Sequence, residues 1–431
     1  MPTMAASLSH LLTLFGLFLL LPLLSTAQAP PPTLPALPLH SSSRWILDAN
    51  NNRVKLRCVN WAGHMEANIP EGLNHQPLDA IVSWIASQGF NCVRLTYSTD
   101  LALTGNTTLV STSFQSAASS WSRPALYSLY TDGILTQNPW INPQTTTTLD
   151  VFSAVIDKLY SAQIVTILDN HVSKASWCCN LTDGNGWWDE ASAYNPFNSR
   201  FFNTRNWLSG LSSIASFSRF HPGVVGMSLR NELRAFLFQD LNSRKDWYDF
   251  VSSGARLVHE TNPLLLVVIG GSQSSTDLTH LRTVKPLDTG PWKDKHVWEM
   301  HAYSFTVTFP DPFKNCDLVK LAYGAFSGFV LEQDRTWTGP LILSEFGVGM
   351  SGGEHDGLNE QDSRYLDCLV GYMENNDADW AVWALQGSYY IRDGQVDYDE
   401  GWGLLNRDWS GWRNDKFAAK LRGMWNVTQG P

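Results

Sequence analysis

The sequence carries little charge, and most of that charge is negative. Only 16% of its 431 residues are Asp, Glu, Lys or Arg, and the formal net charge is −10. There is no long run of Lys or Arg, which argues against nucleic acid and against an anionic membrane surface as partners. Hydrophobic residues nevertheless make up 43% of the chain, which excludes a disordered protein and is enough to build a sizeable core.

The signatures of several common enzyme classes are also missing. No Gly-rich turn follows the first predicted strand, so the nucleotide fingerprint of an open doubly wound sheet is absent. There is no Gly-x-Ser-x-Gly sequence, which removes the commonest esterase signature. The six Cys match no zinc spacing, and His171 and His301 with Asp169 lack a close-spaced ligand motif. We therefore expect neither a metal nor another cofactor.

The N-terminal segment is typical of a secretion signal. Leu11–Leu24 is an apolar run of signal-peptide length, too short and too Pro-interrupted to span a membrane, and a small-x-small cleavage pattern follows at Ala27–Ala29. We predict a signal peptide over residues 1–29, a Pro/Ser-rich tether over 30–43 and a single domain over 44–431. No later stretch is long and apolar enough to span a bilayer. The mature protein is expected to be soluble, outside the membrane and extracellular, in the cell wall or apoplast if the source is a plant.

Sequons and cysteines agree with that compartment. Three N-glycosylation sequons begin at Asn106, Asn180 and Asn426, and the six Cys permit three disulfides in fifteen pairings. Cys58 and Cys92 lie in apolar strand-like runs, so buried free thiols are an alternative for these two. The consecutive residues 178 and 179 are both Cys, and one of them could staple the surrounding loop to another Cys.

Short apolar runs alternate with amphipathic stretches along the chain. Strands are predicted over residues 54–61, 91–97, 164–170, 224–229, 264–270, 297–302, 341–346 and 380–385. Helices are predicted over 77–88, 149–160, 197–220, 247–259, 318–336, 361–375 and 414–425. This order predicts an α/β protein, a closed (β/α)8 TIM barrel, with a doubly wound open sheet as the competing fold.

Loops and turns complete the predicted fold. The turn cluster Asp48–Asn52 between two apolar runs predicts a short N-terminal β-hairpin. Long connections follow the second, third and eighth strands, and in a barrel they would surround the active site at the C-terminal face. The 19 Trp include several in these loops, where flat rings suit stacking on sugars. Candidate sugar platforms, each with packing as the alternative, are Trp61, Trp187, Trp188, Tyr389, Tyr390, Trp402 and Trp409.

Two glutamates stand at the ends of predicted strands. Glu232 follows the fourth strand and Glu345 ends the seventh, so both would face the mouth of a barrel. Retaining glycoside cleavage needs two such carboxyl groups, one protonated to donate to the leaving oxygen and one ionised to attack the anomeric carbon. A single Glu there would more simply cap a helix or pair with Arg, but a pair can converge on one cleft.

The sequences Ser228–Glu232 and Leu343–Gly347 carry a family resemblance. With the residues described next, they resemble glycoside hydrolase family 5, the cellulase-like enzymes, including secreted plant members, over nearly all of the predicted domain. The resemblance implies a barrel fold and a retaining hydrolase. It also assigns the roles, with Glu232 as the general acid/base and Glu345 as the nucleophile, which chemistry alone does not assign.

The same resemblance implies six supporting residues. Arg94 would hold the nucleophile ionised, Asn231 would bond the sugar 2-hydroxyl, and Tyr303 would hydrogen-bond the nucleophile. His301 would sit near the acid, His171 follows the third strand as in the family pattern, and Trp383 would form the floor under the reacting sugar. For either His alone, a hydrogen-bonded core residue is the simpler interpretation.

The predicted function is therefore a secreted, monomeric, retaining β-glycosidase that acts on a β-linked glucan or a related cell-wall carbohydrate. A transglycosylase or a small-molecule β-glycosidase with the same site is the alternative, because an alcohol can replace water in the second step. A catalytically dead carbohydrate-binding protein is a further alternative, against which the intact pair of Glu argues.

Overall fold

The fold was analysed in a computed structural model, which describes residues 32–305 and 315–431. The predicted signal peptide, residues 1–29, lies outside the described residues. Within the described ranges, no helix has both the length and the apolar character needed to cross a bilayer.

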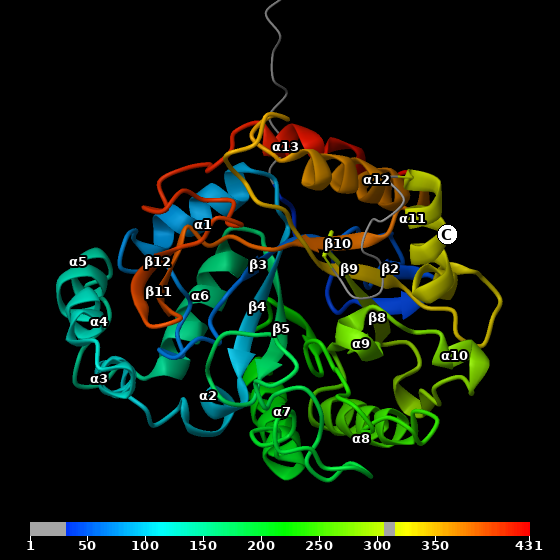
Figure 1. Ribbon diagram of the computed structural model, residues 1–431, viewed down its shortest axis with the longest axis horizontal. Coiled ribbons are helices and arrows are strands. Elements are labelled where there is room, and N and C mark those ends of the chain that lie inside the picture. Colours follow the sequence, from blue (N-terminus) through cyan, green and yellow to red (C-terminus); the bar gives the residue numbers. More distant parts are fainter. Residues whose placement is uncertain (1–31, 306–314) are drawn as a thin grey trace, which may run out of the picture.

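Eight parallel strands close into a barrel (Figure 1). They are β3 (Arg57–Trp61), β4 (Cys92–Ser98), β5 (Val165–Val172), β6 (Val224–Ser228), β7 (Leu266–Gly270), β8 (His296–Ala302), β9 (Leu341–Phe346) and β10 (Asp379–Val382). Each strand pairs with its sequence neighbours, and β10 closes the circle by pairing with β3. The predicted (β/α)8 barrel is confirmed, and the open sheet is excluded because no strand of the barrel has a free edge.

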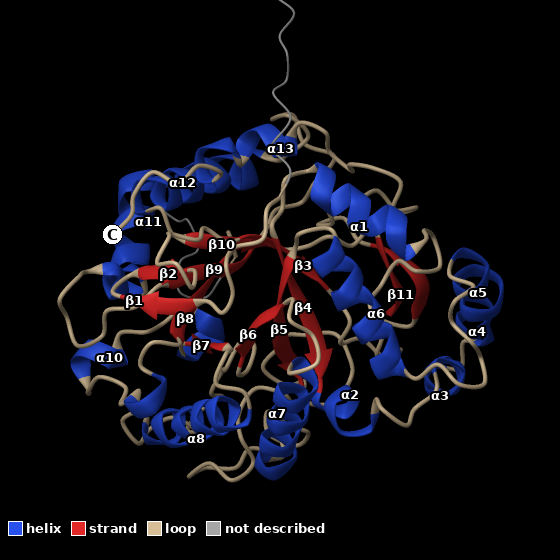
Figure 2. Ribbon diagram, turned by 180° about the vertical axis from the view of Figure 1, so that it is seen from behind, coloured by secondary structure: helices blue, strands red, loops and turns tan. Residues whose placement is uncertain are grey.

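Amphipathic helices cover the outside of the barrel (Figure 2). The main ones are α1 (Leu78–Ser87), α6 (Thr148–Ser161), α7 (Thr204–Ser218), α8 (Lys245–Thr261), α11 (Cys316–Phe326) and α12 (Glu360–Asn376). Each begins close to its predicted start except α7, which begins at Thr204 after an irregular segment. The last predicted helix is reduced to α13 (Phe417–Lys420) and the 3-10 turn η4 (Arg422–Met424).

The loops at the C-terminal ends of the strands hold further structure. The connection after β4, expected only to be long, contains α2 (Thr99–Thr104), α3 (Val110–Trp121), α4 (Pro124–Ser128), the π-helix η1 (Leu129–Ile134) and α5 (Leu135–Gln137). The connection after β10 folds as a hairpin of β11 (Ser388–Arg392) and β12 (Gln395–Asp399). Short elements elsewhere are α9 (Ser272–Ser275), α10 (His280–Thr283), η2 (Gly290–Trp292) and η3 (Gly328–Leu331).

The N-terminal hairpin is present, but it begins earlier than predicted. Strand β1 (His40–Ser42) pairs antiparallel with β2 (Trp45–Leu47), and Leu39 before it is only 1% exposed. The predicted turn at Asp48–Asn52 also forms, closed by a single bridge between Leu47 and Arg53. Within the predicted tether, Leu39 joins the apolar cluster at the N-terminal end of the strands, and His40–Ser42 forms β1.

All six cysteines form disulfides in the structure. Cys58 bonds Cys92, which lies opposite it in the register of β3 and β4, so the alternative of two free thiols is wrong. Cys316 bonds Cys368 and ties α11 to α12. The consecutive residues 178 and 179 bond each other, and neither staples the loop to another Cys.

Candidate active site

The eight predicted site residues meet at the C-terminal ends of the strands. The cavity there has a volume of about 730 Å³ and is lined by six of them: His171, Asn231, Glu232, Tyr303, Glu345 and Trp383. The other two, Arg94 on β4 and His301 on β8, are buried; Arg94 hydrogen-bonds Glu345 and Asn231, and His301 hydrogen-bonds Glu232. The convergence follows from the barrel itself, because the carboxyl ends of all eight strands open onto one mouth.

The two glutamates face each other across a short distance. A carboxylate oxygen of Glu232, one of Glu345 and a ring nitrogen of His301 all lie within 4.8 Å of one another. Retaining glycosidases place their carboxyl groups about 5–5.5 Å apart, whereas inverting enzymes leave roughly 6.5–9.5 Å for a water molecule. The close spacing fits the shorter of these two separations and suits direct attack by one of the carboxyl groups.

Glu345 is held by a buried guanidinium. Arg94 donates from Nη1 to Oε1 of Glu345 at 2.8 Å, and its Nη2 lies 2.8 Å from Oδ1 of Asp169. Burial opposes the charge on Arg94, but Asp169, Glu345 and Glu299 outweigh it and raise the pKa of Arg94 above its ordinary value. Arg94 is therefore a permanent cation beside the carboxylate. Its Nη2 also donates to Oδ1 of Asn231 at 2.9 Å, which orients that amide.

Tyr303 and His301 complete the surroundings of Glu345. The Tyr303 hydroxyl donates to Oε2 of Glu345 at 3.0 Å. Nδ1 of His301 lies 3.0 Å from Oε1 of Glu232 and 3.6 Å from Oε2 of Glu345. Burial would lower the pKa of His301, but Glu345 and the hydrogen bond to Glu232 outweigh it and raise that pKa. Burial raises the pKa of Glu345, and the charges of His301 and Arg94 oppose that rise.

His171 is fixed by its neighbours on both ring nitrogens. Its Nδ1 lies 2.6 Å from Oδ2 of Asp169, and Nδ2 of Asn231 lies 3.4 Å from its Nε2. Burial and the nearby Arg94 push the pKa of His171 well below its ordinary value, so the ring is neutral at neutral pH. A neutral ring that donates from Nδ1 to the carboxylate accepts at Nε2, which fits the donor amide of Asn231.

Trp383 forms an apolar part of the cavity wall. Its indole stacks on His171 with 5.3 Å between ring centroids and 14° between the ring planes. Of the loop aromatics proposed as sugar platforms, only Trp402 lines the cavity. Trp187 and Trp188 are fully buried and pack against each other, and Trp188 also packs against Phe202, so both belong to the core.

Sequence reasoning missed several residues of the cavity wall. These residues are Trp177, Phe305 and Arg392. Arg392 lies over the Trp177 ring at 3.5 Å and donates at 2.6 Å to Glu400, a mouth-loop residue for which the sequence left sugar contact or a solvated face open and which also lines the cavity. Trp177 and Phe305 stand in mouth loops that follow strands, which is the one signal that could have found them. Arg392 lies on β11, and the hairpin that carries it into the cavity was not predicted.

Two groups in the described residues have the close spacing of metal ligands. One is the pair of glutamates with His301, and the other is Glu232 with the two neighbouring cysteines. The cysteines are joined in a disulfide and offer no thiolate, while His301 and Glu345 already hold fixed hydrogen bonds. The arrangement instead suits covalent catalysis at an electrophilic carbon, with one buried carboxylate as nucleophile and a second, more open carboxyl group for proton transfer.

Comparison with known proteins shows what this chain is similar to. The family model "Cellulase (glycosyl hydrolase family 5)" matches residues 47–388. A "Glycosyl hydrolase 5 family protein" from Chamaecyparis obtusa is 39% identical over 410 residues, which cover 92% of this chain and 67% of that protein. The "Major extracellular endoglucanase" of Xanthomonas campestris pv. campestris is 22% identical over 405 residues, covering 90% of this chain and 71% of that protein.

A solved structure has the same fold. The endocellulase from Pyrococcus horikoshii, in complex with cellotetraose, superposes with a TM-score of 0.67 and 17% sequence identity. The superposition covers 92% of this chain and all of that one.

Proposed function

Because this chain belongs to glycosyl hydrolase family 5, whose members are retaining glycoside hydrolases, we propose that it hydrolyses a β-linked glucan or a related cell-wall polysaccharide or oligosaccharide. In this proposal Glu232 is the general acid/base and Glu345 is the nucleophile. The observation that carries it is the pair of carboxyl groups within 4.8 Å of each other, one of them bound by Arg94 and Tyr303. The cellotetraose bound by the Pyrococcus horikoshii enzyme supports glucan as the substrate class.

The surroundings of the two glutamates support the assignment of roles. Glu345 is 4% exposed and receives hydrogen bonds from Arg94 and Tyr303, which favour its charged form. The Glu232 side chain is 16% exposed, and its carboxylate contacts His301. A nucleophile needs a fixed, ionised carboxylate, whereas an acid/base must reach first a leaving oxygen and then water. Glu232 is the more exposed of the two, which fits the acid/base.

The reaction would proceed in two steps. In the first, an oxygen of Glu345 bonds to the anomeric carbon, the bond from that carbon to the leaving oxygen breaks, and Glu232 gives its proton to that oxygen. In the second, Glu232 takes a proton from water, the water oxygen bonds to the anomeric carbon and the carboxylate of Glu345 leaves. Asn231 is placed to bond the sugar 2-hydroxyl, and Trp383 is placed to pack against the sugar ring.

We also propose that the protein is secreted as a monomer and glycosylated. Residues 1–29 have the sequence of a signal peptide, and the relative from Xanthomonas campestris is named as extracellular. The three sequon residues Asn106, Asn180 and Asn426 are exposed, as acceptors must be. All six Cys are paired, which suits an oxidising compartment.

A substrate panel with a nucleophile variant tests the proposed function. β-1,4-Glucan, β-1,3-glucan, mannan, xyloglucan and aryl β-glycosides are incubated with the purified secreted protein and with Glu345→Gln. We expect turnover of at least one β-glucan, and a loss of about 10⁴-fold or more in Glu345→Gln, because a neutral amide cannot form the glycosyl-enzyme. Full hydrolysis by Glu345→Gln would contradict the assigned nucleophile, and silence on every substrate would contradict the proposed activity.

A further inference from the structure

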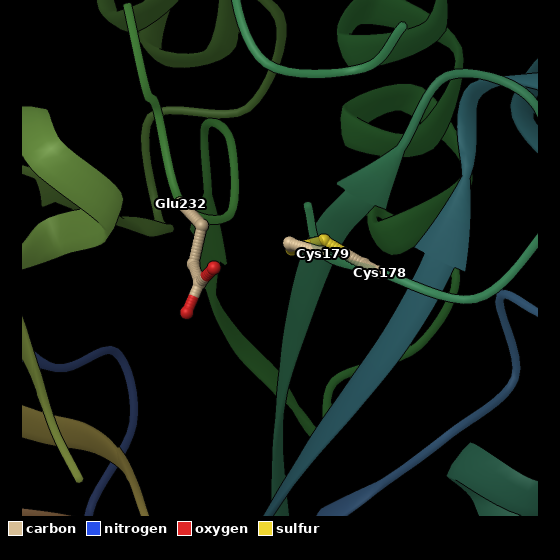
Figure 3. A group of neighbouring side chains, drawn as sticks. All are labelled: Cys178, Cys179 and Glu232. Carbon is tan, nitrogen blue, oxygen red and sulfur yellow. A yellow bond between two sulfur atoms is a disulfide. The ribbon is translucent and has the colours of Figure 1, made fainter. Parts of the chain in front are cut away.

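The cavity wall beside Glu232 contains a disulfide between two consecutive residues, Cys178 and Cys179. Figure 3 shows the disulfide and the Glu232 side chain next to each other. Both sulfurs lie within 4.8 Å of a carboxylate oxygen of Glu232. Cys178 is 7% exposed and Cys179 is partly exposed, so the bond presents a surface to the cavity.

This disulfide has little use as a structural staple. A disulfide stabilises a fold mainly by closing a loop of chain, and the effect grows with the length of that loop. The bonds Cys58–Cys92 and Cys316–Cys368 span 34 and 52 residues, whereas Cys178 and Cys179 are adjacent. The adjacent pair closes no loop, so its place in the cavity calls for another explanation.

The surface around the disulfide is largely apolar. Trp177 lines the cavity directly before it, and Leu181, Phe236 and Leu237 line the same cavity. Leu181 is 48% exposed and Leu237 is 69% exposed. Sulfur in a disulfide is polarisable and has no strong hydrogen-bonding group, so it suits contact with an apolar surface. The amide Nδ2 of Asn231 points at both sulfurs, 3.7 and 3.6 Å away, and sets the position of the disulfide relative to the reacting sugar.

Glu232 lies between the disulfide surface and the other groups of the proposed catalytic site. Glu232 belongs to two close groups, one with the two sulfurs and one with His301 and Glu345. The reacting sugar must lie against Glu345, and the proton of Glu232 must reach the oxygen of the group that leaves. The leaving group therefore lies on the side of Glu232 where the sulfurs stand.

We propose that the Cys178–Cys179 disulfide is the platform of the leaving-group subsite and receives the apolar face of the ring that leaves. That ring is the next pyranose of a glucan or an aromatic aglycone, since both present a flat apolar face. The inference rests on the proposed function and adds to it a specificity-determining element on the leaving side of the cleavage point. The disulfide binds and orients that ring and takes no part in bond making.

Two substrates distinguish an effect on binding of the leaving ring from an effect on the bond-making steps. Cellotetraose must place a sugar ring on the leaving side, whereas β-D-glucosyl fluoride uses the same nucleophile and has only fluoride as its leaving group. For Cys178→Ser/Cys179→Ser we expect KM for cellotetraose to rise about tenfold and turnover of the fluoride to stay within about twofold of wild type. The matched control Cys316→Ser/Cys368→Ser also lacks one disulfide and should leave both substrates within about twofold, because that bond joins two outer helices.

An aryl substrate identifies the ring that the platform prefers. A larger rise in KM for cellotetraose than for 4-nitrophenyl β-cellobioside assigns the platform to a pyranose, and the reverse assigns it to an aromatic aglycone. If Cys178→Ser/Cys179→Ser lost equal activity on cellotetraose and on the fluoride, or changed on neither, the proposed platform would be overturned.

Failure of the proposed function gives a different result. If the wild-type protein hydrolyses neither of these two substrates, cellotetraose and the fluoride, nor any other substrate of the panel, the proposed activity is wrong. The dissociation constant for cellotetraose, measured by tryptophan fluorescence, then shows whether the disulfide contributes to binding a sugar ring. A dissociation constant about tenfold higher for Cys178→Ser/Cys179→Ser than for wild type supports the proposed platform, and an unchanged constant overturns it.

Discussion

At the scale of single residues, the site depends on groups that act on Glu345 from several strands. Arg94 supplies a permanent charge from β4, and Tyr303 supplies a neutral donor just after β8. Donors of both kinds favour the ionised carboxylate against the burial that raises its pKa. Each donor should therefore contribute to the reactivity of Glu345, the proposed nucleophile, and to the lower pH limit of activity.

The variant Tyr303→Phe tests the neutral donor. It removes one hydrogen bond to Glu345, so we expect kcat to fall about 100-fold, the low end of the losses for single donors in active sites. The pKa of Glu345 should rise further, so the acidic limb of the kcat/KM profile should move to higher pH.

A second tyrosine serves as the control. The Tyr248 hydroxyl lies within hydrogen-bond distance of two backbone oxygens, 2.5 Å from that of Lys285 and 3.0 Å from that of His280, away from the site. Tyr248→Phe loses a comparable hydrogen bond and should keep its kcat and its pH profile. If both variants lost activity equally, the hydrogen bond to Glu345 would have no special role.

At the scale of elements, the outer helices differ in how firmly they are attached. Helix α12 buries eight residues, whereas Tyr323 is the one buried residue of α11 among those described. The Cys316–Cys368 bond joins the two helices across 52 residues of sequence. The weakly packed helix therefore depends on the covalent link more than its neighbour does.

Removal of this bond should lower stability without changing catalysis. For Cys316→Ser/Cys368→Ser we expect the free energy of unfolding to fall by about 2–4 kcal/mol, because the unfolded chain regains the freedom of a long loop. Urea denaturation followed by tryptophan fluorescence measures the loss. The variant Cys178→Ser/Cys179→Ser is the comparison. It removes a disulfide that closes no loop of chain, so its free energy of unfolding should fall much less. Equal losses would show that loop closure is not the cause.

At the scale of the whole molecule, stability should depend on pH through histidines that are buried neutral. His280 on α10 is 2% exposed and lies against Trp247, with 4.3 Å between ring centroids. Burial and the nearby Arg244 lower its pKa from 6.5 to about 4. The unfolded chain therefore binds a proton between these two pH values that the folded chain does not, so stability decreases as the pH falls through this range.

The variant His280→Gln tests this, because glutamine binds no proton in either the folded or the unfolded chain. Between pH 7 and pH 4.5 the wild type should lose about 2–3 kcal/mol more stability than His280→Gln, given a folded pKa near 4 and an unfolded pKa of 6.5. Urea denaturation at a series of pH values gives both curves. Parallel curves for the two proteins would show that His280 titrates alike in the folded and unfolded chains. The absolute stability of the variant at pH 7 does not enter this comparison.

The sequence alone determined the architecture and the residues at the strand ends. Apolar runs alternate with amphipathic stretches because parallel strands are buried on both faces and helices on one, and both patterns are local. Glu232 and Glu345 were visible because Glu232 stands shortly after such a run and Glu345 near the end of another, and a closed barrel brings strand ends together wherever they stand in the chain.

The tertiary structure alone decided the features that depend on register and on loop paths. Cys58 faces Cys92 only because β3 and β4 pair in that register, and no local pattern encodes it. The hairpin β11–β12 carries Arg392 to the cavity wall, and the loop after β5 places Trp177 and the disulfide beside Glu232. Loop paths are set by contacts between segments far apart in sequence, so the proposed leaving-group side of the site could be inferred only from the folded molecule.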